Sequence, residues 1–392
     1  MDVLLACYTD SLGHAGRSSL FARLLARSGV RVEIAGGGQF DPLFQTPVHA
    51  SPQVPYAMLG DWLGCYLPGL PFVFDGANTL SEPLHRRLIG EGMDLEALTQ
   101  RWLKLLDEIR PDVIVADGRP EVYWAAHRLG IPLFGIMSFV WTEHFCERFA
   151  YFETDEHAPL HDSRRLEAFN RVGANLGLAP VQDCWAPFRG RAALLPDSLH
   201  FVGMRSGAGF LTLGPLVWSG PPSNGLDLSP GPFVYATTGT SQFAHIERLA
   251  RRVAEAGVCV ILSGDLRGQG TQASGTIPGL VSPNLVRWHG VAPGAALAGA
   301  ADLVLSHGGS QTLYQAAMSG TFSCVVPYHF DHRRNATMFE SFSLALVLPE
   351  DGNLASWGEI ILGLLANGLP EVRLPPEEPL SPAELRRFLE SS

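Results

Sequence analysis

Two series of alternating segments constrain the fold of this chain most strongly. In the first half, the apolar run "DVLLACY" precedes the loop "TDSLGHAGR", the helical pattern "SSLFARLLARSG" and the apolar run "VRVEIAGG". In the second half, "GPFVYATTGTSQFAHIERLARRVAEAG" begins a similar series, which continues through "VCVILSG", "ADLVLSHGG" and "FSCVVPY". A strand, a crossover helix and another strand in this order are typical of a parallel sheet. Each half is therefore predicted to be a Rossmann-like, doubly wound α/β domain.

The length of 392 residues allows two such domains. Residues 214–232 are rich in proline, glycine and serine, and are predicted to connect them. We expect an N-terminal domain over residues 1–213 and a C-terminal domain over residues 233–375. The segment 376–392 contains a final amphipathic helix capped by Ser381, which is expected to pack back on the N-terminal domain. Two domains joined in this way would form a cleft between opposed strand ends, where ligands are expected.

The composition excludes several function classes. A net charge of −11 argues against a nucleic-acid binder, which needs a basic face, and weakens docking on an anionic membrane. The first residues lack the pattern of a signal peptide, and no window approaches the length of a transmembrane helix. The six scattered cysteines form no CxxC pair and are expected to be buried free thiols. The protein is therefore expected to be soluble and cytoplasmic.

The stretch "LSHGGSQTLYQAAMSG", residues 305–320, suggests a binding site at the start of a helix. It predicts a strand end, a glycine pair and a helix that begins near Ser310 and ends near Gly320. The first amides of a helix have no intrahelical acceptor, and the positive end of the helix dipole lies there. A phosphate is the expected ligand. The alternative is an ordinary turn in which Ser310 is only an N-cap.

Two neighbouring strand ends offer further polar groups. The strand that ends at Pro327 is followed by a predicted loop with His329, Asp331, His332 and Asn335. Upstream, "VRWHGVAPGAALAG" predicts a strand, a Val-Ala-Pro loop and a helix of small residues. Because parallel strands end at one edge of a sheet, these groups are expected to line one cleft.

Together these motifs resemble those of the GT-B nucleotide-sugar glycosyltransferases of the family-one type. The matching segments are "HGVAP…ADLVLSHGGSQT", "PYHFDHRRNA" and "LGHAGR". The resemblance covers nearly the whole chain and is strongest over residues 284–340. It implies two Rossmann-like domains facing each other across a cleft. It also implies inverting transfer of a sugar from a UDP- or dTDP-sugar to a hydroxyl of a small apolar or aromatic acceptor.

The resemblance also bears on cofactors and partners. The chain contains no DxD motif, and its histidines and cysteines show no metal spacing, which favours a metal-independent hexosyltransferase without a cofactor. The partners implied are the nucleotide-sugar donor and the small acceptor. A homodimer is compatible with this class, and the biological role suggested by analogy is tailoring in secondary metabolism.

The donor-binding residues implied by the resemblance lie in the second half of the chain. They fall into four groups: a first phosphate-side loop, a base pocket, the diphosphate site with the ribose position, and the sugar site. The phosphate-side loop comprises Thr238, Gly239 and Thr240, and the base pocket comprises Trp288 and Val291. The diphosphate site with the ribose position comprises His307, Gly309, Ser310, Gln311, Thr312 and Gln315. The sugar site comprises Asp331 and His332.

Three positions depart from the pattern of the family. His332 stands where the family usually has glutamine after the aspartate, which leaves the sugar preference open. Gln315 stands where many relatives have a glutamate that holds the ribose diol, and an amide is no charged bidentate acceptor. Arg17 stands where proline is usual, and could be solvated or could add positive potential to the cleft.

The resemblance assigns catalysis to His14 in the "GH" loop. A neutral imidazole can take the proton of the acceptor hydroxyl as that oxygen attacks the anomeric carbon. Asp117, at the end of the predicted strand "PDVIVAD", would hold its tautomer. The alternatives are an exposed or capping histidine, and an aspartate that caps a helix beginning at Pro120. Asp10 and Glu143 are further carboxylates to consider.

Aromatic residues of the first half are candidates for an acceptor pocket. They lie in residues 55–76 and 139–153, and the alternative is ordinary core and loop packing. The candidates are Trp62, Phe139, Trp141 and Phe145.

Two other functions are alternatives to sugar transfer. A non-catalytic homologue could act as an auxiliary partner of another enzyme, and a sugar-nucleotide epimerase could share the architecture. A dinucleotide dehydrogenase is excluded because the first loop lacks GxGxxG.

Overall fold

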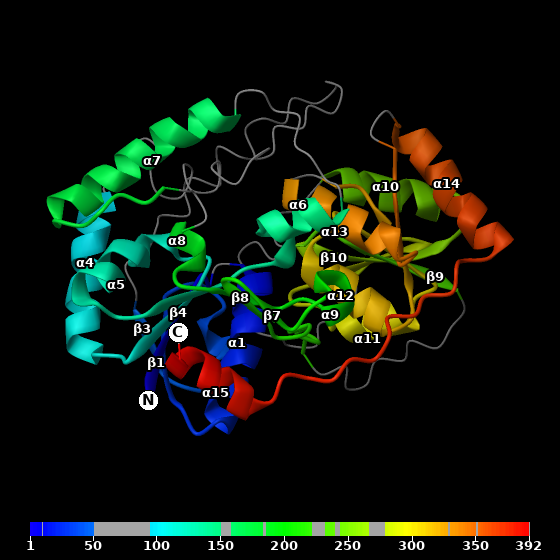
Figure 1. Cartoon of the computed structure of the whole chain (residues 1–392). Coiled ribbons are helices and arrows are strands. Elements are labelled where there is room, and N and C mark those ends of the chain that lie inside the picture. The colour runs from blue at the N-terminus through cyan, green and yellow to red at the C-terminus, as the bar shows by residue number, and fades with distance from the viewer. Residues whose placement is uncertain are drawn as a thin grey trace. The chain divides into compact units, whose positions relative to one another are not determined.

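The computed structural model divides the chain into two compact units (Figure 1). The N-terminal unit comprises Met1–Leu216 and Glu377–Ser392, and the C-terminal unit comprises Val217–Pro376. The residues that the structure describes are 1–9, 11–50, 95–149, 158–182, 186–221, 232–239, 244–265, 279–327, 330–349 and 352–391. Among these residues, none of the helices has the length and apolar character needed to cross a membrane.

The N-terminal unit contains an eight-stranded sheet in the order β3-β2-β1-β4-β5-β6-β8-β7. All neighbouring strands are parallel except β7 and β8. The central strands β1 and β4 are almost wholly buried, as their continuous apolar runs predict. The strands are β1 (Asp2–Cys7), β2 (Arg31–Gly36), β3 (Val48–Ala50), β4 (Val113–Asp117), β5 (Leu133–Ile136), β6 (Ala193–Leu195), β7 (Ser206–Gly207) and β8 (Phe210–Thr212).

Helices connect these strands. The α-helices of the unit are α1 (Leu12–Arg27), α4 (Leu95–Ile109), α5 (Tyr123–Leu129), α6 (Glu143–Phe149), α7 (Ala158–Asn175), α8 (Ala186–Arg189), α9 (Leu199–Val202) and α15 (Pro382–Ser391). Short 3₁₀ turns are η1 (Asp41–Leu43), η3 (Pro120–Val122) and η4 (Phe139–Trp141). The unit therefore alternates strands and helices as a doubly wound fold requires.

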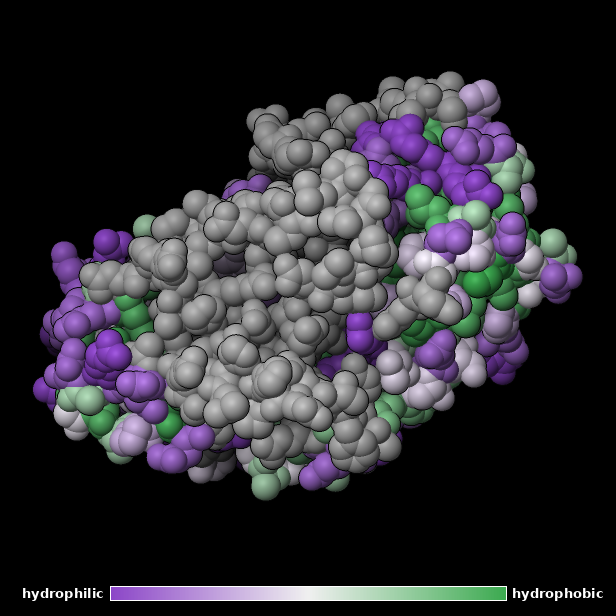
Figure 2. All heavy atoms as spheres, turned by 90° about the horizontal axis from the view of Figure 1, so that it is seen from above, coloured by the Kyte–Doolittle hydropathy of each residue, from purple (hydrophilic) through white to green (hydrophobic). Residues whose placement is uncertain are grey.

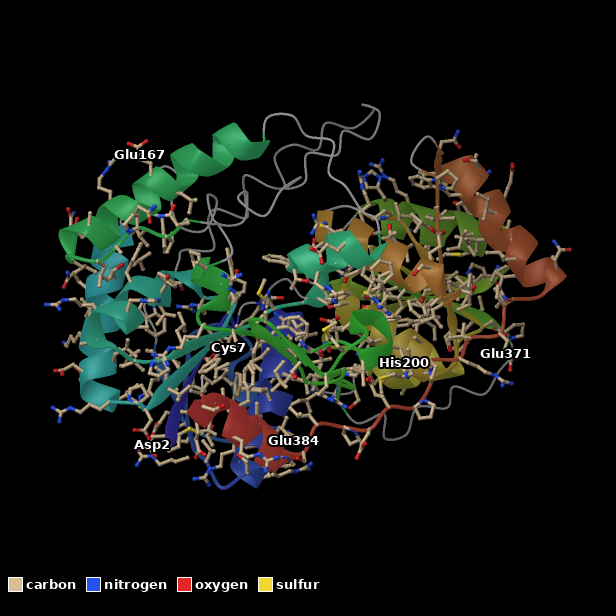
Figure 3. The ribbon with its side chains drawn as sticks, viewed as in Figure 1. Asp2, Cys7, Glu167, His200, Glu371 and Glu384 are labelled. Carbon is tan, nitrogen blue, oxygen red and sulfur yellow. The ribbon has the colours of Figure 1, made fainter. Side chains whose placement is uncertain are left out.

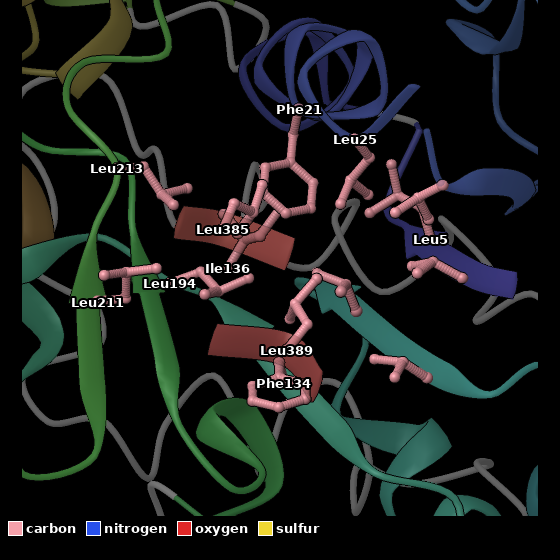
Figure 4. Packing of buried hydrophobic residues seen from close by; sticks show 14 of the residues in the cluster. Leu5, Phe21, Leu25, Phe134, Ile136, Leu194, Leu211, Leu213, Leu385 and Leu389 are labelled. Atoms are coloured by element: carbon pink, nitrogen blue, oxygen red, sulfur yellow. The ribbon is translucent and has the colours of Figure 1, made fainter. Parts of the chain in front are cut away.

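The last helix of the chain, α15, belongs to the core of the N-terminal unit. Leu385 and Leu389 of α15 are buried in one cluster with Phe21 and Leu25 of α1 (Figure 4). Phe388 approaches Phe134 of β5, with ring centroids 6.0 Å apart. Ser381 caps α15, because its hydroxyl accepts from the amide of Glu384. Residues from both ends of the chain thus build one hydrophobic core.

The C-terminal unit contains a seven-stranded sheet in the order β11-β12-β10-β9-β13-β14-β15, parallel except for β11 and β12. The strands are β9 (Phe233–Thr237), β10 (Cys259–Asp265), β11 (Gly279–Ser282), β12 (Leu285–His289), β13 (Leu303–Ser306), β14 (Phe322–Val325) and β15 (Ala345–Val347). The helices are α10 (Ala244–Glu255), α11 (Gly294–Ala300), α12 (Ser310–Met318), α13 (Phe330–Ser341) and α14 (Leu354–Asn367). Thr237, Ser306 and Val325 are in register, so three strand ends lie side by side.

The predicted fold class, two Rossmann-like α/β domains, is confirmed. Two predicted loops are instead helical. Helix α1 begins at Leu12, so His14 lies in its first turn and not in a loop. Helix α13 begins at Phe330, so Asp331, His332 and Asn335 lie on a helix. In both cases residues that look like polar loop continue the helix toward the strand end, because propensity is a weak prior that tertiary context overrides.

The surface shows mixed character. On the face in Figure 2, hydrophilic and hydrophobic residues are intermixed within the described parts. Among the residues that the structure describes, the exposed large hydrophobic side chains are Leu129, Met204, Met318 and Phe342, which lie in separate segments. Single exposed apolar residues of this kind are ordinary for a protein surface.

Candidate active site

In the N-terminal unit, the candidate site forms where β1 and β4 end. These neighbouring strands pair Cys7 with Asp117 at their carboxyl ends, and Figure 3 marks Cys7 at this edge. Helix α1 begins at Leu12, soon after β1 ends at Cys7, with Ser11 in extended conformation at its N-cap. This short connection brings the first turn of α1, with His14, over the end of β4.

His14 and Asp117 are in direct contact. His14 Nδ1 lies 2.6 Å from Asp117 Oδ1, and the carboxylate is fully buried while a quarter of the His14 side chain is exposed. The ring of Tyr8 meets the imidazole edge-on, with centroids 5.8 Å apart. The structure thus brings together the two residues that the sequence assigned to a catalytic dyad.

Two further residues of α1 hold the same carboxylate. Arg17 donates from Nε to Asp117 Oδ2 at 2.8 Å and from Nη2 to Oδ1, while Ser18 Oγ donates to Oδ2 at 2.7 Å. Burial would raise the pKa of Asp117, but Arg17 and His14 together lower it well below its ordinary value. Asp117 is therefore an anion at neutral pH, and both of its oxygens accept hydrogen bonds.

The charge of Asp117 fixes the tautomer of His14. A carboxylate only accepts, so its contact with Nδ1 at 2.6 Å favours the tautomer with the proton on Nδ1, while the donor Arg17 Nη2 lies 2.8 Å from the same nitrogen. A neutral His14 then has its lone pair on Nε2, as a general base requires. The alternative role of Asp117 as a helix cap does not hold, because η3 has Arg119 at its N-cap and no side-chain capping bond.

The pairing of Arg17 and Ser18 with Asp117 was missed at the sequence level. His14, Arg17 and Ser18 occupy positions i, i+3 and i+4 of one helix, and this spacing places side chains on one face. Once α1 is extended to Leu12, that face is readable from the sequence. The earlier alternative of a solvated Arg17 is wrong, since the residue is 9% exposed.

The aromatic candidates for an acceptor pocket differ in exposure. Phe139 and Phe145 are fully buried and pack edge-on, with centroids 5.7 Å apart, so they stabilise the segment after β5. Trp141 is partly exposed and packs against Phe188. The buried carboxylate of Asp197 accepts from the amide of Phe139 at 2.6 Å and fixes this turn. Trp62, Asp10 and the side chain of Glu143 lie outside the described residues.

In the C-terminal unit, α12 begins directly after the glycine pair. Gly309 is its extended N-cap and Ser310 its first residue, so the alternative in which Ser310 is the N-cap is wrong. The hydroxyl-bearing residues Ser310 and Thr312 lie in the first turn and are partly exposed. The helix ends at Met318, followed by Gly320 in left-handed conformation with φ 78°.

His307 is enclosed beside this helix start. A Cβ on Gly239 or on Gly309 would lie 2.6 Å or 2.8 Å from atoms of its ring, so both positions require glycine. The ring of His332 lies edge-on to it, with centroids 4.5 Å apart. Burial lowers the pKa of His332 to about 3, and burial together with His332 lowers that of His307 well below its ordinary value. Both imidazoles are therefore neutral at neutral pH.

The remaining donor candidates fall into different environments. Gln315 Nε2 donates to the carbonyl of Trp218 at 2.7 Å, and the amide of Trp218 donates to Gln311 Oε1 at 3.0 Å. The two glutamines therefore hold one residue of the segment before β9 from both sides. Trp288 is 7% exposed and packs in a hydrophobic cluster with Tyr235.

The other candidates lie at the strand ends. Thr238 is buried after β9, with its amide donating to the carbonyl of Ser263 at 3.0 Å, while Val291 and Asp331 are partly exposed. Thr240 lies outside the described residues. Among the residues that the structure describes, no group of three or more histidine, cysteine, aspartate or glutamate side chains could hold a metal ion.

Comparison with known proteins extends this description. No family model matches the chain. By sequence, the chain is similar to the PGL/p-HBAD biosynthesis rhamnosyltransferases of Mycobacterium bovis (strain BCG / Pasteur 1173P2) and of Mycobacterium tuberculosis strains, with 27% identity over 278 residues. The match covers 63% of this chain and spans 58% of the length of those relatives.

Solved structures are similar over the whole chain. The spinosyn rhamnosyltransferase SpnG in complex with the spinosyn aglycone superposes with a TM-score of 0.64 at 16% identity, covering 100% of both chains. The glycosyltransferase VinC in complex with dTDP gives a TM-score of 0.62 at 18% identity, covering 100% of this chain and 99% of the other. The Streptomyces sp. SF2575 glycosyltransferase SsfS6 with thymidine diphosphate gives 0.61 at 17% identity, covering 100% of both. The chain therefore has the GT-B fold, and the resemblance drawn from its motifs is confirmed at the level of the fold.

Proposed function

We propose that this protein is an inverting, metal-independent glycosyltransferase that moves a sugar from a dTDP- or UDP-sugar to a hydroxyl of a small acceptor. The observation that supports it best is the contact of His14 Nδ1 with the buried carboxylate of Asp117. This contact leaves Nε2 as the basic nitrogen in a chain with the GT-B fold. The similar structures in complex with dTDP favour dTDP as the nucleotide.

In the proposed reaction, His14 takes the proton of the acceptor hydroxyl as its oxygen attacks the anomeric carbon. Asp117 stabilises the imidazolium that forms. The nucleoside diphosphate leaves with the electron pair of the glycosidic bond. We place that diphosphate at the first turn of α12, where the amides and the hydroxyls of Ser310 and Thr312 would donate to it.

We also propose roles for the other donor residues. The enclosed, neutral imidazole of His307 can donate one hydrogen bond without the pH dependence of a charged group. Asp331 and His332, on the first turn of α13, would face the sugar hydroxyls. Because Gln315 donates to the carbonyl of Trp218, we propose that Gln315 fixes the segment before β9 and does not hold the ribose diol.

The acceptor is proposed from the relatives and from the aromatic segment after β5. The relatives are described as PGL/p-HBAD biosynthesis rhamnosyltransferases, and SpnG is described as complexed with the spinosyn aglycone. An aromatic or polyketide-like alcohol, modified as a tailoring step in secondary metabolism, is the acceptor class that we propose. Of the described acceptor candidates, Trp141 is partly exposed, whereas Phe139 and Phe145 are buried.

A transfer assay tests the proposal. The protein is incubated with dTDP-rhamnose, dTDP-glucose or UDP-glucose and a panel of phenolic and macrolactone acceptors, with and without EDTA. Mass spectrometry would show the glycoside, and its anomeric configuration would show inversion. Nucleotide binding without transfer to any acceptor would favour a non-catalytic homologue, and conversion of the donor to its epimer would favour an epimerase.

A further inference from the structure

The carboxylate of Asp117 is bound more extensively than a two-residue dyad needs. Its Oδ1 accepts from His14 and from Arg17 Nη2, and its Oδ2 accepts from Arg17 Nε and Ser18 Oγ. Arg17 grips both oxygens as a fork, and its Nη2 lies only 2.8 Å from His14 Nδ1. A guanidinium is always charged in proteins, so a permanent cation stands beside the imidazole.

We infer that Arg17 is a positioning residue for the proposed reaction: it fixes Asp117 against His14 and keeps the imidazole neutral and ready as a base below neutral pH. The inference rests on the proposed function only in treating His14 as the catalytic base.

The charges around His14 support this role. In a plain dyad the carboxylate favours the imidazolium and raises the histidine pKa. Here Arg17 offsets the charge of Asp117, so a proton on His14 would meet the Arg17–Asp117 ion pair, whose cationic Nη2 lies 2.8 Å from His14 Nδ1. His14 also lies in the first turn of α1, where the positive end of the helix dipole disfavours a cation.

Other groups near the site do not reverse this balance. Tyr8, from the end of β1, presents its ring, and burial keeps the Cys7 thiol neutral by raising its pKa. After β4, Arg119 pairs with Glu121. Asp197 acts on Arg17 from a distance and is hydrogen-bonded to the turn at Phe139.

The charged groups on the other elements that pack against α1 have partners of their own. On β2, Glu33 pairs with His49 at 2.7 Å and Arg31 at 2.9 Å. On η1, Asp41 accepts from the backbone amide of Gly37 at 3.0 Å. On α15, Arg386 pairs with Glu390 and approaches Gly29, which follows the opposite end of α1.

The test is an NMR titration of His14 in the full chain, assigned with the His14→Ala variant and needing no substrate. The wild-type pKa of His14 should lie below the ordinary histidine value of about 6.5. In Arg17→Gln, which removes the charge but keeps an amide donor, the pKa should rise by about one unit or more. Arg17→Lys, which keeps the charge, should stay close to the wild type.

Two results would overturn the inference. One is a wild-type His14 pKa at or above about 6.5, which decides the matter even if the glutamine variant does not fold. The other is a folded Arg17→Gln protein whose His14 titrates as in the wild type, because a merely structural arginine would change stability and leave that pKa alone.

Kinetics separates this inference from the proposed function. If transfer occurs, the acidic limb of the pH profile of kcat/KM should move to higher pH in Arg17→Gln and not in Arg17→Lys. A shifted His14 pKa without transfer to any acceptor would reject the glycosyltransferase and keep the role of Arg17 in setting His14. Transfer that requires His14, with an acidic limb unmoved in Arg17→Gln, would reject the role of Arg17 alone.

Discussion

The two units differ in the charge of the groups at the carboxyl ends of their parallel strands. The N-terminal unit buries full charges, with Asp117 held by Arg17, Ser18 and His14. The C-terminal unit gathers neutral donors: two imidazoles with lowered pKa, hydroxyls and the amides of a helix start. A charged network suits proton transfer, because it sets a pKa. Neutral, fixed donors suit an anion that must be bound equally well across a range of pH.

Replacing His14 in the N-terminal unit should have the largest effect on sugar transfer. In His14→Ala, transfer should fall by about 10²–10⁴-fold, the usual contribution of a general base. The dTDP affinity should stay unchanged, since the diphosphate is placed in the other unit. Calorimetry and a transfer assay on the same preparation check this, and a large loss of nucleotide affinity would contradict the division of roles.

Asp117→Asn should affect both activity and stability. Removing the anion leaves Arg17 buried without its ion pair, which should cost about 3–5 kcal/mol of unfolding free energy. Transfer should fall by about 10²-fold or more, because the amide stabilises no imidazolium. The double variant Asp117→Asn/Arg17→Gln serves as the control. If it is no more stable in urea than Asp117→Asn, the buried ion pair is not what stabilises this edge of the sheet.

Thr312→Ala should weaken nucleotide binding and spare the chemistry. A hydrogen bond to a charged group contributes about 1.5–3 kcal/mol, so the dTDP dissociation constant should rise about tenfold or more. At saturating donor, the transfer rate should stay close to that of the wild type. Thr312→Ser keeps the hydroxyl and should bind nearly as the wild type does. Undiminished affinity in Thr312→Ala would exclude the first turn of α12 as the diphosphate site.

His332→Gln should change the free energy of unfolding least among these variants, and this change should depend on acidic pH. The pKa of His332 is about 3 in the folded protein and about 6.5 when unfolded, so the unfolded chain binds the extra proton between these values. Stability therefore falls as pH decreases below about 6.5, by up to ~1.4 kcal/mol per pH unit for this group. His332→Gln should make that decline shallower, as measured by urea unfolding at pH 7 and pH 5. An identical slope would show that His332 is not buried as a neutral ring.

The sequence allowed the fold class to be predicted because continuous apolar runs and helical spacing are local patterns. The start of α12 at Ser310 was likewise readable from the glycine pair. The first turn of α1 was not, because "LGHAG" has the composition of a loop and only its docking over β4 makes it helical. Because this turn was predicted to be a loop, the common helix face of His14, Arg17 and Ser18 was not predicted.

The roles of the two glutamines could not be read from the sequence for a different reason. Gln311 and Gln315 bind Trp218, which lies 93 and 97 residues earlier in the chain. Polar contacts at such separations depend on how the connecting segment runs across α12, and no local pattern encodes it. The burial of Trp288 is similar, because only the packing of α11 on the sheet turns this candidate base-pocket residue into a core residue.

The most direct test of the account is a calorimetric titration of the wild-type chain with dTDP, UDP and their glucose conjugates, each with and without EDTA. The account predicts micromolar binding of one nucleotide, unaffected by EDTA, and the same affinity in His14→Ala. Absence of binding by all four compounds would contradict it, because the first turn of α12, where the diphosphate is proposed to bind, would then hold no nucleotide.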